Sequence, residues 1–115
     1  MKANDRSGVI HLADIRAKIP GPAGERSAPV LRRGTLDLKL NVLLPPNATA
    51  THAQDEIYIV LAGRGSFVHN GERDPIEPGA FLFVAAGVEH HFEEFEELTL
   101  WRIYYGVNGG EMPGK

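Results

Sequence analysis

Hydrophobic and polar residues alternate with a period of two along most of the chain after residue 33. In residues 36–44, leucine or valine occupies every second position, with Asp37, Lys39 and Asn41 between them. Successive side chains of a β-strand point to opposite faces, so the pattern predicts a strand with one apolar face. The sequence Pro45-Pro46-Asn47 ends this strand.

The rest of the chain predicts further short strands separated by turns. The strands are expected at residues 56–62, 66–69, 81–85, 88–92 and 98–105. Asn70-Gly71 is the strongest hairpin signal among the turns. Leu12, Ile15 and Ile19 have helical spacing before Pro20-Gly21. We therefore predict an all-β fold, a double-stranded β-helix or jelly-roll barrel with at most one short N-terminal helix.

A chain of 115 residues is long enough for one domain. We expect residues 34–106 to form the barrel. Residues 1–33 are expected to be an N-terminal extension that pairs with the barrel or packs on it, and residues 107–115 a C-terminal tail.

Composition narrows the range of functions. The absence of cysteine excludes disulfides and thiolate metal sites. A formal net charge of -3 argues against nucleic-acid binding, which usually requires a basic face. The first residues contain no apolar segment typical of a signal peptide, and the longest apolar run is too short to span a membrane. We expect a cytoplasmic protein with neither nucleic acid nor membrane as a partner.

The residues with the most distinctive chemistry are His52, Glu56 and His90. Residues two or four apart in a strand share a face, so His52 and Glu56 point the same way if residues 52–56 are extended. Two imidazoles and one carboxylate can hold a divalent transition metal (Fe, Mn, Ni, Cu or Zn) and leave coordination positions open. The alternative is a polar pocket in which the histidines hydrogen-bond Glu56 without a metal.

Neighbouring residues complete the predicted site. Tyr58 shares the face of Glu56 and is the candidate catalytic residue, as a proton shuttle. Gln54 shares the face of His52 and is a candidate weak extra ligand, whereas Asp55 is expected to point away. A divalent ion with two imidazoles and one carboxylate leaves a positive charge, which favours an anionic ligand. The candidate anchors for that ligand are Arg64 and Arg102. The remaining histidines are not expected to bind metal: His11, His69 and His91.

These motifs resemble those of the cupins. The first cupin motif runs G-x5-H-x-H-x(3,4)-E-x6-G, and its second half is matched by His52, Glu56 and Gly63. The second motif runs G-x5-P-x-G-x2-H-x3-N, and its spacing is matched by Gly79, Gly87 and His90. Four positions depart from these motifs: Leu44, Ala50, Ala85 and Glu94 replace the glycine, the first histidine, the proline and the asparagine.

The resemblance implies a small jelly-roll barrel, often dimeric, with a metal inside that is held by His52, Glu56 and His90. The missing histidine at Ala50 lowers the expected metal affinity. We expect a homodimer, because residues 98–105 are apolar on both faces, so that one face can fill the barrel and the other can meet a partner chain.

Three functions remain open from the sequence. The first is metal-dependent chemistry on a small anionic or sugar-like molecule, of the dioxygenase or isomerase type. The second is a non-catalytic module that binds a small molecule or a metal. The third is a metal-free epimerase or isomerase pocket, in which His52 or His90 acts with Tyr58 as the acid–base pair.

Overall fold

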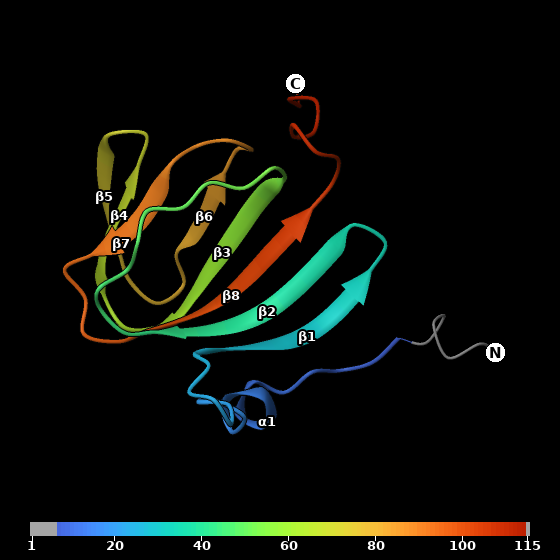
Figure 1. Ribbon diagram of the computed structural model, residues 1–115, viewed down its shortest axis with the longest axis vertical. Coiled ribbons are helices and arrows are strands. Elements are labelled where there is room, and N and C mark those ends of the chain that lie inside the picture. Colours follow the sequence, from blue (N-terminus) through green and yellow to red (C-terminus); the bar gives the residue numbers. More distant parts are fainter. Residues whose placement is uncertain (1–6, 115) are drawn as a thin grey trace.

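The computed structural model describes residues 7–114 and consists almost entirely of antiparallel β-strands. One short helix precedes eight strands: α1 (Leu12–Arg16), β1 (Ser27–Arg33), β2 (Leu36–Leu43), β3 (Asp55–Ala62), β4 (Gly65–His69), β5 (Glu72–Ile76), β6 (Phe81–Val84), β7 (His90–Glu93) and β8 (Leu98–Tyr105). They form a five-stranded sheet in the order β1-β2-β8-β3-β6 and a three-stranded sheet in the order β5-β4-β7. The two sheets face each other (Figure 1), so the predicted all-β, jelly-roll fold is confirmed.

The turns follow from local sequence. Asn70 and Gly71 connect β4 to β5 with φ angles of 49° and 82°. Two consecutive residues with positive φ are what a two-residue hairpin requires, and asparagine followed by glycine tolerates them best. The turn sets the register in which Phe67 lies opposite Asp74.

The interior between the sheets contains most of the apolar core. Tyr58 and Val60 of β3, Phe67 of β4, and Leu98 and Leu100 of β8 are buried there together. At 25 cal/mol per Å², each fully buried side chain of this kind contributes about 2 kcal/mol. This core fixes which face of β3 and β8 points inward.

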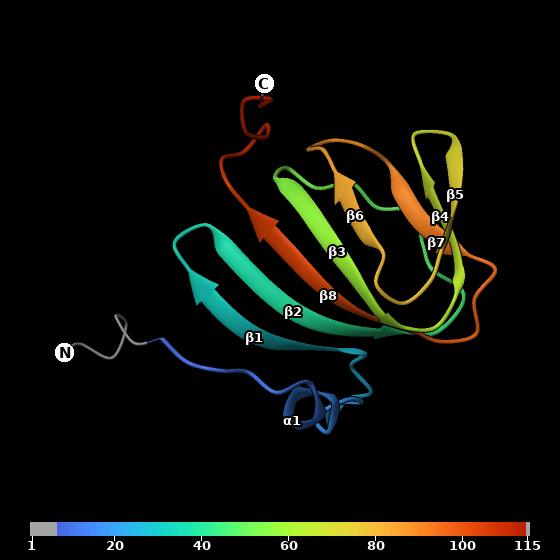
Figure 2. The same cartoon turned by 180° about the vertical axis from the view of Figure 1, so that it is seen from behind.

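The apolar face of β2 points outward, away from this interior. Leu40 and Val42 are fully buried against Ile19 and Ala28 in a second cluster, and Ile15 of α1 packs against this cluster. The N-terminal segment therefore supplies the cover for this part of the sheet and runs beside β1 (Figure 2). The polar face of β2 consequently lines the inner side of the sheet.

Residues 27–33, within the predicted N-terminal extension, form the edge strand β1 and pair with β2. Residues 1–6 and 115 of the predicted extension and tail lie outside the described residues.

Candidate metal centre

Three separate segments bring His52, Glu56 and His90 together. Glu56 is on β3, His90 begins β7, and His52 lies in the connection between β2 and β3. Backbone hydrogen bonds hold these segments: Ala50 and His90 exchange N–H···O bonds of 3.0 Å, and Gly87 N–H donates to the His52 carbonyl at 2.8 Å. Gly87 has a φ of 82°, which a glycine adopts without strain.

The donor atoms are spaced for a small metal ion. Nε2 of His90 lies 2.9 Å from Oε1 of Glu56, and Nε2 of His52 lies 3.7 Å from the same oxygen. One ligand atom from each residue falls within 4.8 Å of the others. Ligand bonds of about 2.1 Å place neighbouring donors about 3.0–3.4 Å apart, so the two measured distances bracket the required value.

Glu56 is fully buried, with 0 % of its surface exposed. The contact with His90 is short but poorly aligned, and neither carboxylate oxygen has an aligned hydrogen-bond partner in the part of the chain that the structure describes. A buried carboxylate without such partners is costly unless a cation neutralises it. The donor set and this buried carboxylate therefore fit a divalent metal.

The orientation of His90 also suits metal binding. Its Nδ1 lies 2.9 Å from the carbonyl oxygen of Val88, which fixes the neutral tautomer with the proton on Nδ1 and directs the lone pair of Nε2 toward Glu56. Burial alone lowers the pKa of His90, but the contacts with Glu56 and the Val88 carbonyl outweigh it, so the net shift is upward.

Tyr58 lies beside this imidazole, with its hydroxyl 3.3 Å from Nε2 of His90. Burial, followed by the negative charge of Glu56, raises the pKa of Tyr58 far above its ordinary value. The phenol therefore keeps its proton at neutral pH and can donate it in a hydrogen bond.

The sequence analysis did not assign Tyr104 to the site, yet it contacts the other imidazole. Its hydroxyl lies 2.8 Å from Nε2 and 3.0 Å from Nδ1 of His52. Tyr104 and Glu56 are cross-strand neighbours in the β3–β8 ladder. Burial is the main cause that lowers the pKa of His52, which keeps this imidazole neutral and available as a ligand. Only the register between strands that are distant in sequence reveals the role of Tyr104.

The other candidates are divided between the interior and the surface. Nε2 of Gln54 donates to the Gly106 carbonyl at 2.8 Å, so this amide is engaged away from the cluster. Asp55 accepts hydrogen bonds from the backbone of Ala86 and Glu111. Arg64 is exposed and pairs with Glu77 at 2.8 Å. These three side chains therefore support the surrounding loops.

The remaining histidines are also placed. His91 is bonded to Glu93 on the outer side of β7. His11 precedes α1 and is exposed. His69 lies opposite His90 in the β4–β7 ladder, and its ring stacks on Phe67 at 4.8 Å. Although His69 is next to a hairpin, it therefore shares the inner face with His90.

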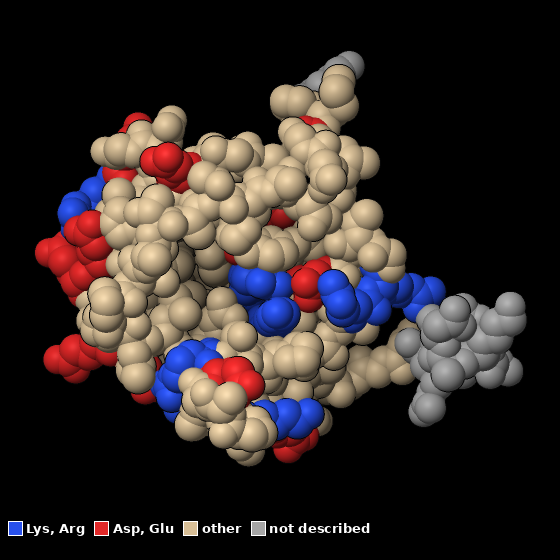
Figure 3. All heavy atoms as spheres, viewed as in Figure 1, with Lys and Arg blue, Asp and Glu red and all other residues tan. Residues whose placement is uncertain are grey.

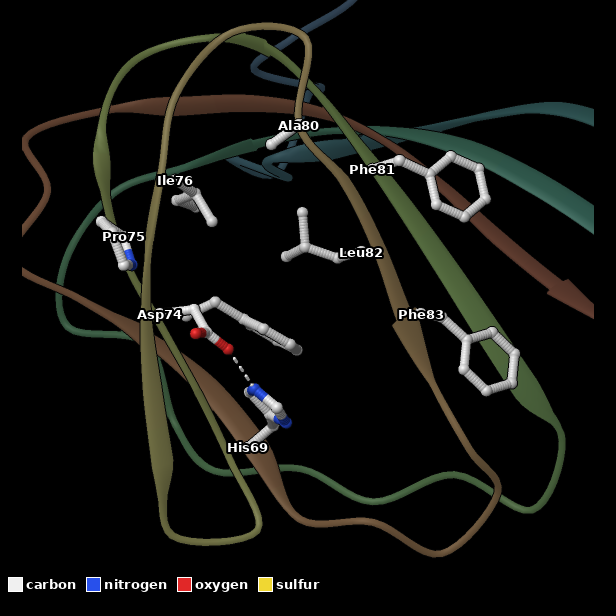
Figure 4. A pocket seen from close by; sticks show the side chains of 9 residues that line it. His69, Asp74, Pro75, Ile76, Ala80, Phe81, Leu82 and Phe83 are labelled. Atoms are coloured by element: carbon white, nitrogen blue, oxygen red, sulfur yellow. Dashed lines mark hydrogen bonds and ion pairs between the residues drawn. The ribbon is translucent and has the colours of Figure 1, made fainter.

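A pocket of about 290 Å³ opens between β5 and β6, at the edge where the two sheets do not pair. Figure 4 shows Ile76 and Leu82 pointing into it, with the rings of Phe81 and Phe83 on the other side of β6. His69 and Asp74 form a 2.7 Å contact at its rim. Phe67 lines the pocket and lies 6.3 Å from the His90 ring, centroid to centroid, so only a layer of aromatic side chains separates the pocket from the cluster.

The fold and the site together define the class of this protein. It is a small jelly-roll barrel that carries a histidine–carboxylate cluster, a candidate metal centre, on its inner face. The cupin domain family matches residues 40–98, and the chain belongs to this family. This confirms the resemblance seen in the motifs.

Several known proteins are similar to this chain in sequence or in structure. The transcriptional activator RhaR of Mannheimia succiniciproducens is 36% identical over 61 residues, which are 53% of this chain and 22% of that protein. The chain spans less than half the length of the curated relatives it matches. A candidate mannose-6-phosphate isomerase of Ralstonia eutropha superposes with a TM-score of 0.66 at 19% identity, covering 89% of this chain and all of that one. A predicted oxalate decarboxylase of Thermotoga maritima gives a TM-score of 0.56 at 26% identity over 62% of this chain and 66% of that chain.

In the part of the chain that the structure describes, no helix is long and apolar enough to cross a membrane.

Proposed function

We propose that this cupin binds a divalent transition metal through His52, Glu56 and His90 and acts on a small anionic or sugar-like molecule. The observation that carries the proposal is the convergence of three donor atoms on a fully buried carboxylate that lacks an aligned hydrogen-bond partner among the described residues. The candidate ions are Fe, Mn, Ni, Cu and Zn.

When bound, the metal would supply a Lewis acid with open positions for a chelating ligand or for dioxygen. The protein groups around it have defined tasks. The Val88 carbonyl orients His90, and the Tyr104 hydroxyl contacts His52. Tyr58 keeps its proton on the inner face and is the proposed hydrogen-bond donor to the bound molecule. This division of roles supports oxygenase-type or isomerase-type chemistry.

The pocket between β5 and β6 is the proposed site for the apolar part of that molecule. Its volume of about 290 Å³ is just below the usual range of about 300–1,000 Å³ for small-molecule sites. It has apolar walls and the polar pair His69–Asp74 at the rim. Such a combination holds a small organic molecule and fixes its orientation.

Metal content measured by inductively coupled plasma mass spectrometry tests the proposal. We expect close to one equivalent in the wild type and its loss in both His52→Ala and His90→Ala. The matched control is His91→Ala, because this adjacent histidine faces outward and contacts Glu93. No metal in the wild type after reconstitution would refute the proposal and favour the metal-free pocket, in which the Tyr58–His90 contact is the acid–base pair.

A non-catalytic sensing module is the second candidate, and the match to a transcriptional activator favours it. In this case metal and ligand bind without turnover. A panel of metabolites, tested by calorimetry for binding and by product analysis for turnover, distinguishes the enzyme from the sensing module. An enzyme converts the bound ligand, whereas a sensing module releases it unchanged.

We further propose that a second copy of the chain covers the outer face of the five-stranded sheet. An apolar row crosses all five strands in register: Phe83, Ile57, Ile103, Leu38 and Leu31. Phe83 is 52% exposed, although it is a large apolar residue. A self-complementary row of this kind suits a two-fold homodimer.

Light scattering tests the dimer. We expect twice the chain mass in the wild type, a monomer for Phe83→Lys, and a dimer for the control Val9→Lys, which changes an exposed residue outside the row. A monomeric wild type at working concentration would contradict the proposal.

A further inference from the structure

Two basic residues lie side by side on the inner face of the five-stranded sheet. Lys39 of β2 and Arg102 of β8 are directly opposed in the antiparallel ladder. Their neighbours Leu40 and Trp101 belong to the outer cluster, so both basic side chains point to the inner side. Like charges in directly opposed positions destabilise a sheet. Figure 3 shows basic side chains gathered over β8, β2 and β1 on this side of the molecule.

Little negative charge is available to offset this pair. Asp37 lies 3.4 Å from Nη2 of Arg102, and the same carboxylate oxygen is 3.8 Å from Nη2 of Arg32. Lys39 is half-buried and has no ion pair or hydrogen bond with any described side chain. Three cations therefore lie around the single carboxylate of Asp37, and the next acidic group on the inner face is the buried Glu56, opposite Tyr104.

Arg102 is the most constrained of the three. It is only 9 % exposed, and its guanidinium lies 3.7 Å from the centre of the Tyr104 ring. Its Nε and Nη2 are buried and have no aligned hydrogen-bond partner among residues 7–114. A guanidinium offers its donors as a rigid fork that matches the two oxygens of a carboxylate. Here the Nε–Nη2 edge of that fork has no hydrogen bond to a described residue, and its one ion pair among these residues is the 3.4 Å contact between Nη2 and Asp37.

The basic pair Lys39–Arg102 lies next to the His52–Glu56–His90 cluster. Arg102 is opposite Tyr58, and Tyr104 is opposite Glu56, in the β3–β8 ladder. Tyr104 contacts Arg102 through its ring and His52 through its hydroxyl. An anionic group at the basic pair would therefore belong to a molecule that also reaches the cluster.

We propose that Arg102 and Lys39 form an oxyanion subsite that binds a carboxylate of the small molecule, while other atoms of that molecule reach the His52–Glu56–His90 cluster. The second half of this statement rests on the proposed metal function, but the subsite itself does not. The ligand class is thereby narrowed to small carboxylic acids with a second donor group, such as dicarboxylates and 2-oxo acids.

Calorimetric titration with malonate tests the subsite. Binding to the wild type is expected to weaken by about tenfold or more in Lys39→Met. Arg102→Lys keeps the charge but loses the fork, and it should also weaken malonate binding. The matched control Arg64→Met removes an exposed arginine that pairs with Glu77 and should leave malonate binding unchanged.

A second measurement does not depend on ligand binding. Without ligand at low ionic strength, Lys39→Met should have a higher Tm than the wild type, because the opposed like charges are gone. Equal malonate affinity in the wild type and Lys39→Met, or a lower Tm for Lys39→Met, would overturn the proposal. Inorganic phosphate that binds more tightly than malonate and also requires Lys39 would overturn the assignment to a carboxylate.

Metal-stripped His90→Ala separates this proposal from the metal function. If adding Lys39→Met to this variant weakens malonate binding, the subsite is supported, whatever the metal content of the wild type. Loss of the Lys39 dependence in this variant would show that malonate binds only through the metal, and would overturn the subsite.

Discussion

Glu56→Gln should change the stability of the metal-free protein in opposite directions at low and high pH. The pKa of His90 is raised in the folded protein, so its pairing with Glu56 stabilises the fold fully below the ordinary histidine pKa of about 6.5. This contribution is lost as the pH rises through the folded-state pKa of His90. At pH 6, removing the carboxylate breaks an ion pair and should lower the Tm.

At pH 8.5 the His90 imidazole is neutral and the carboxylate of Glu56 is buried without an aligned partner within the described chain. Glutamine removes the charge and can donate to Nε2 of His90, whose Nδ1 proton is directed to Val88. An unsatisfied buried group costs about 1–3 kcal/mol. For a domain of this size 1 kcal/mol corresponds to about 4 °C, so the Tm should rise by about 4–12 °C.

The assay is thermal unfolding of chelator-treated protein at both pH values, with Asp55→Asn as the matched control. Asp55 is also buried, but both of its oxygens accept backbone hydrogen bonds, so its amide variant should be less stable at both pH values. A Glu56→Gln variant that is destabilised equally at pH 6 and pH 8.5 would refute the reasoning. With saturating zinc, the stabilisation that the metal gives the wild type should be absent from this variant.

Three further predictions concern the metal. Ala50→His should tighten zinc binding by about tenfold or more in a chelator competition, because the Ala50–His90 bridge directs a side chain at position 50 toward the cluster. Unchanged affinity would mean that the new imidazole does not reach the ion. Tyr104→Phe should leave the fold intact but weaken zinc binding by about 10- to 100-fold in the same competition, since it removes the hydroxyl that lies 3.0 Å from Nδ1 of His52, the ring nitrogen left to a partner when Nε2 binds the ion. Zinc affinity followed from pH 8.5 to pH 5.5 should fall as protons compete for His90, whose pKa is raised, and a flat profile would argue against His90 as a ligand.

Much of the fold could be read from local patterns. The alternation in residues 36–44, the Asn70-Gly71 turn and the helical spacing near Leu12 each correspond to an element of the structure. These features depend on interactions within a few residues, so they can be predicted from the sequence alone. The motif spacing around His52, Glu56 and His90 also identified the family.

The sequence did not predict which face of each strand points into the barrel and which points outward. The apolar face of β2 packs against Ile19 of the N-terminal segment, which leaves Asp37 and Lys39 on the inner side. Alternation divides a strand into two faces but does not say which one is inside, because either face can be buried when another segment covers it.

The sequence by itself indicated six of the eight strands, several of the turns and the three candidate metal ligands, since these follow from local pattern and spacing, but it did not predict β1 or β5. Only the tertiary structure placed Tyr104 beside His52, His69 on the inner face, and Arg102 opposite both Lys39 and Tyr58. The physical reason is register: residues of β8 pair with residues of β2 and β3 that lie 37 or more positions earlier in the chain. That alignment is decided by the shared core of both sheets.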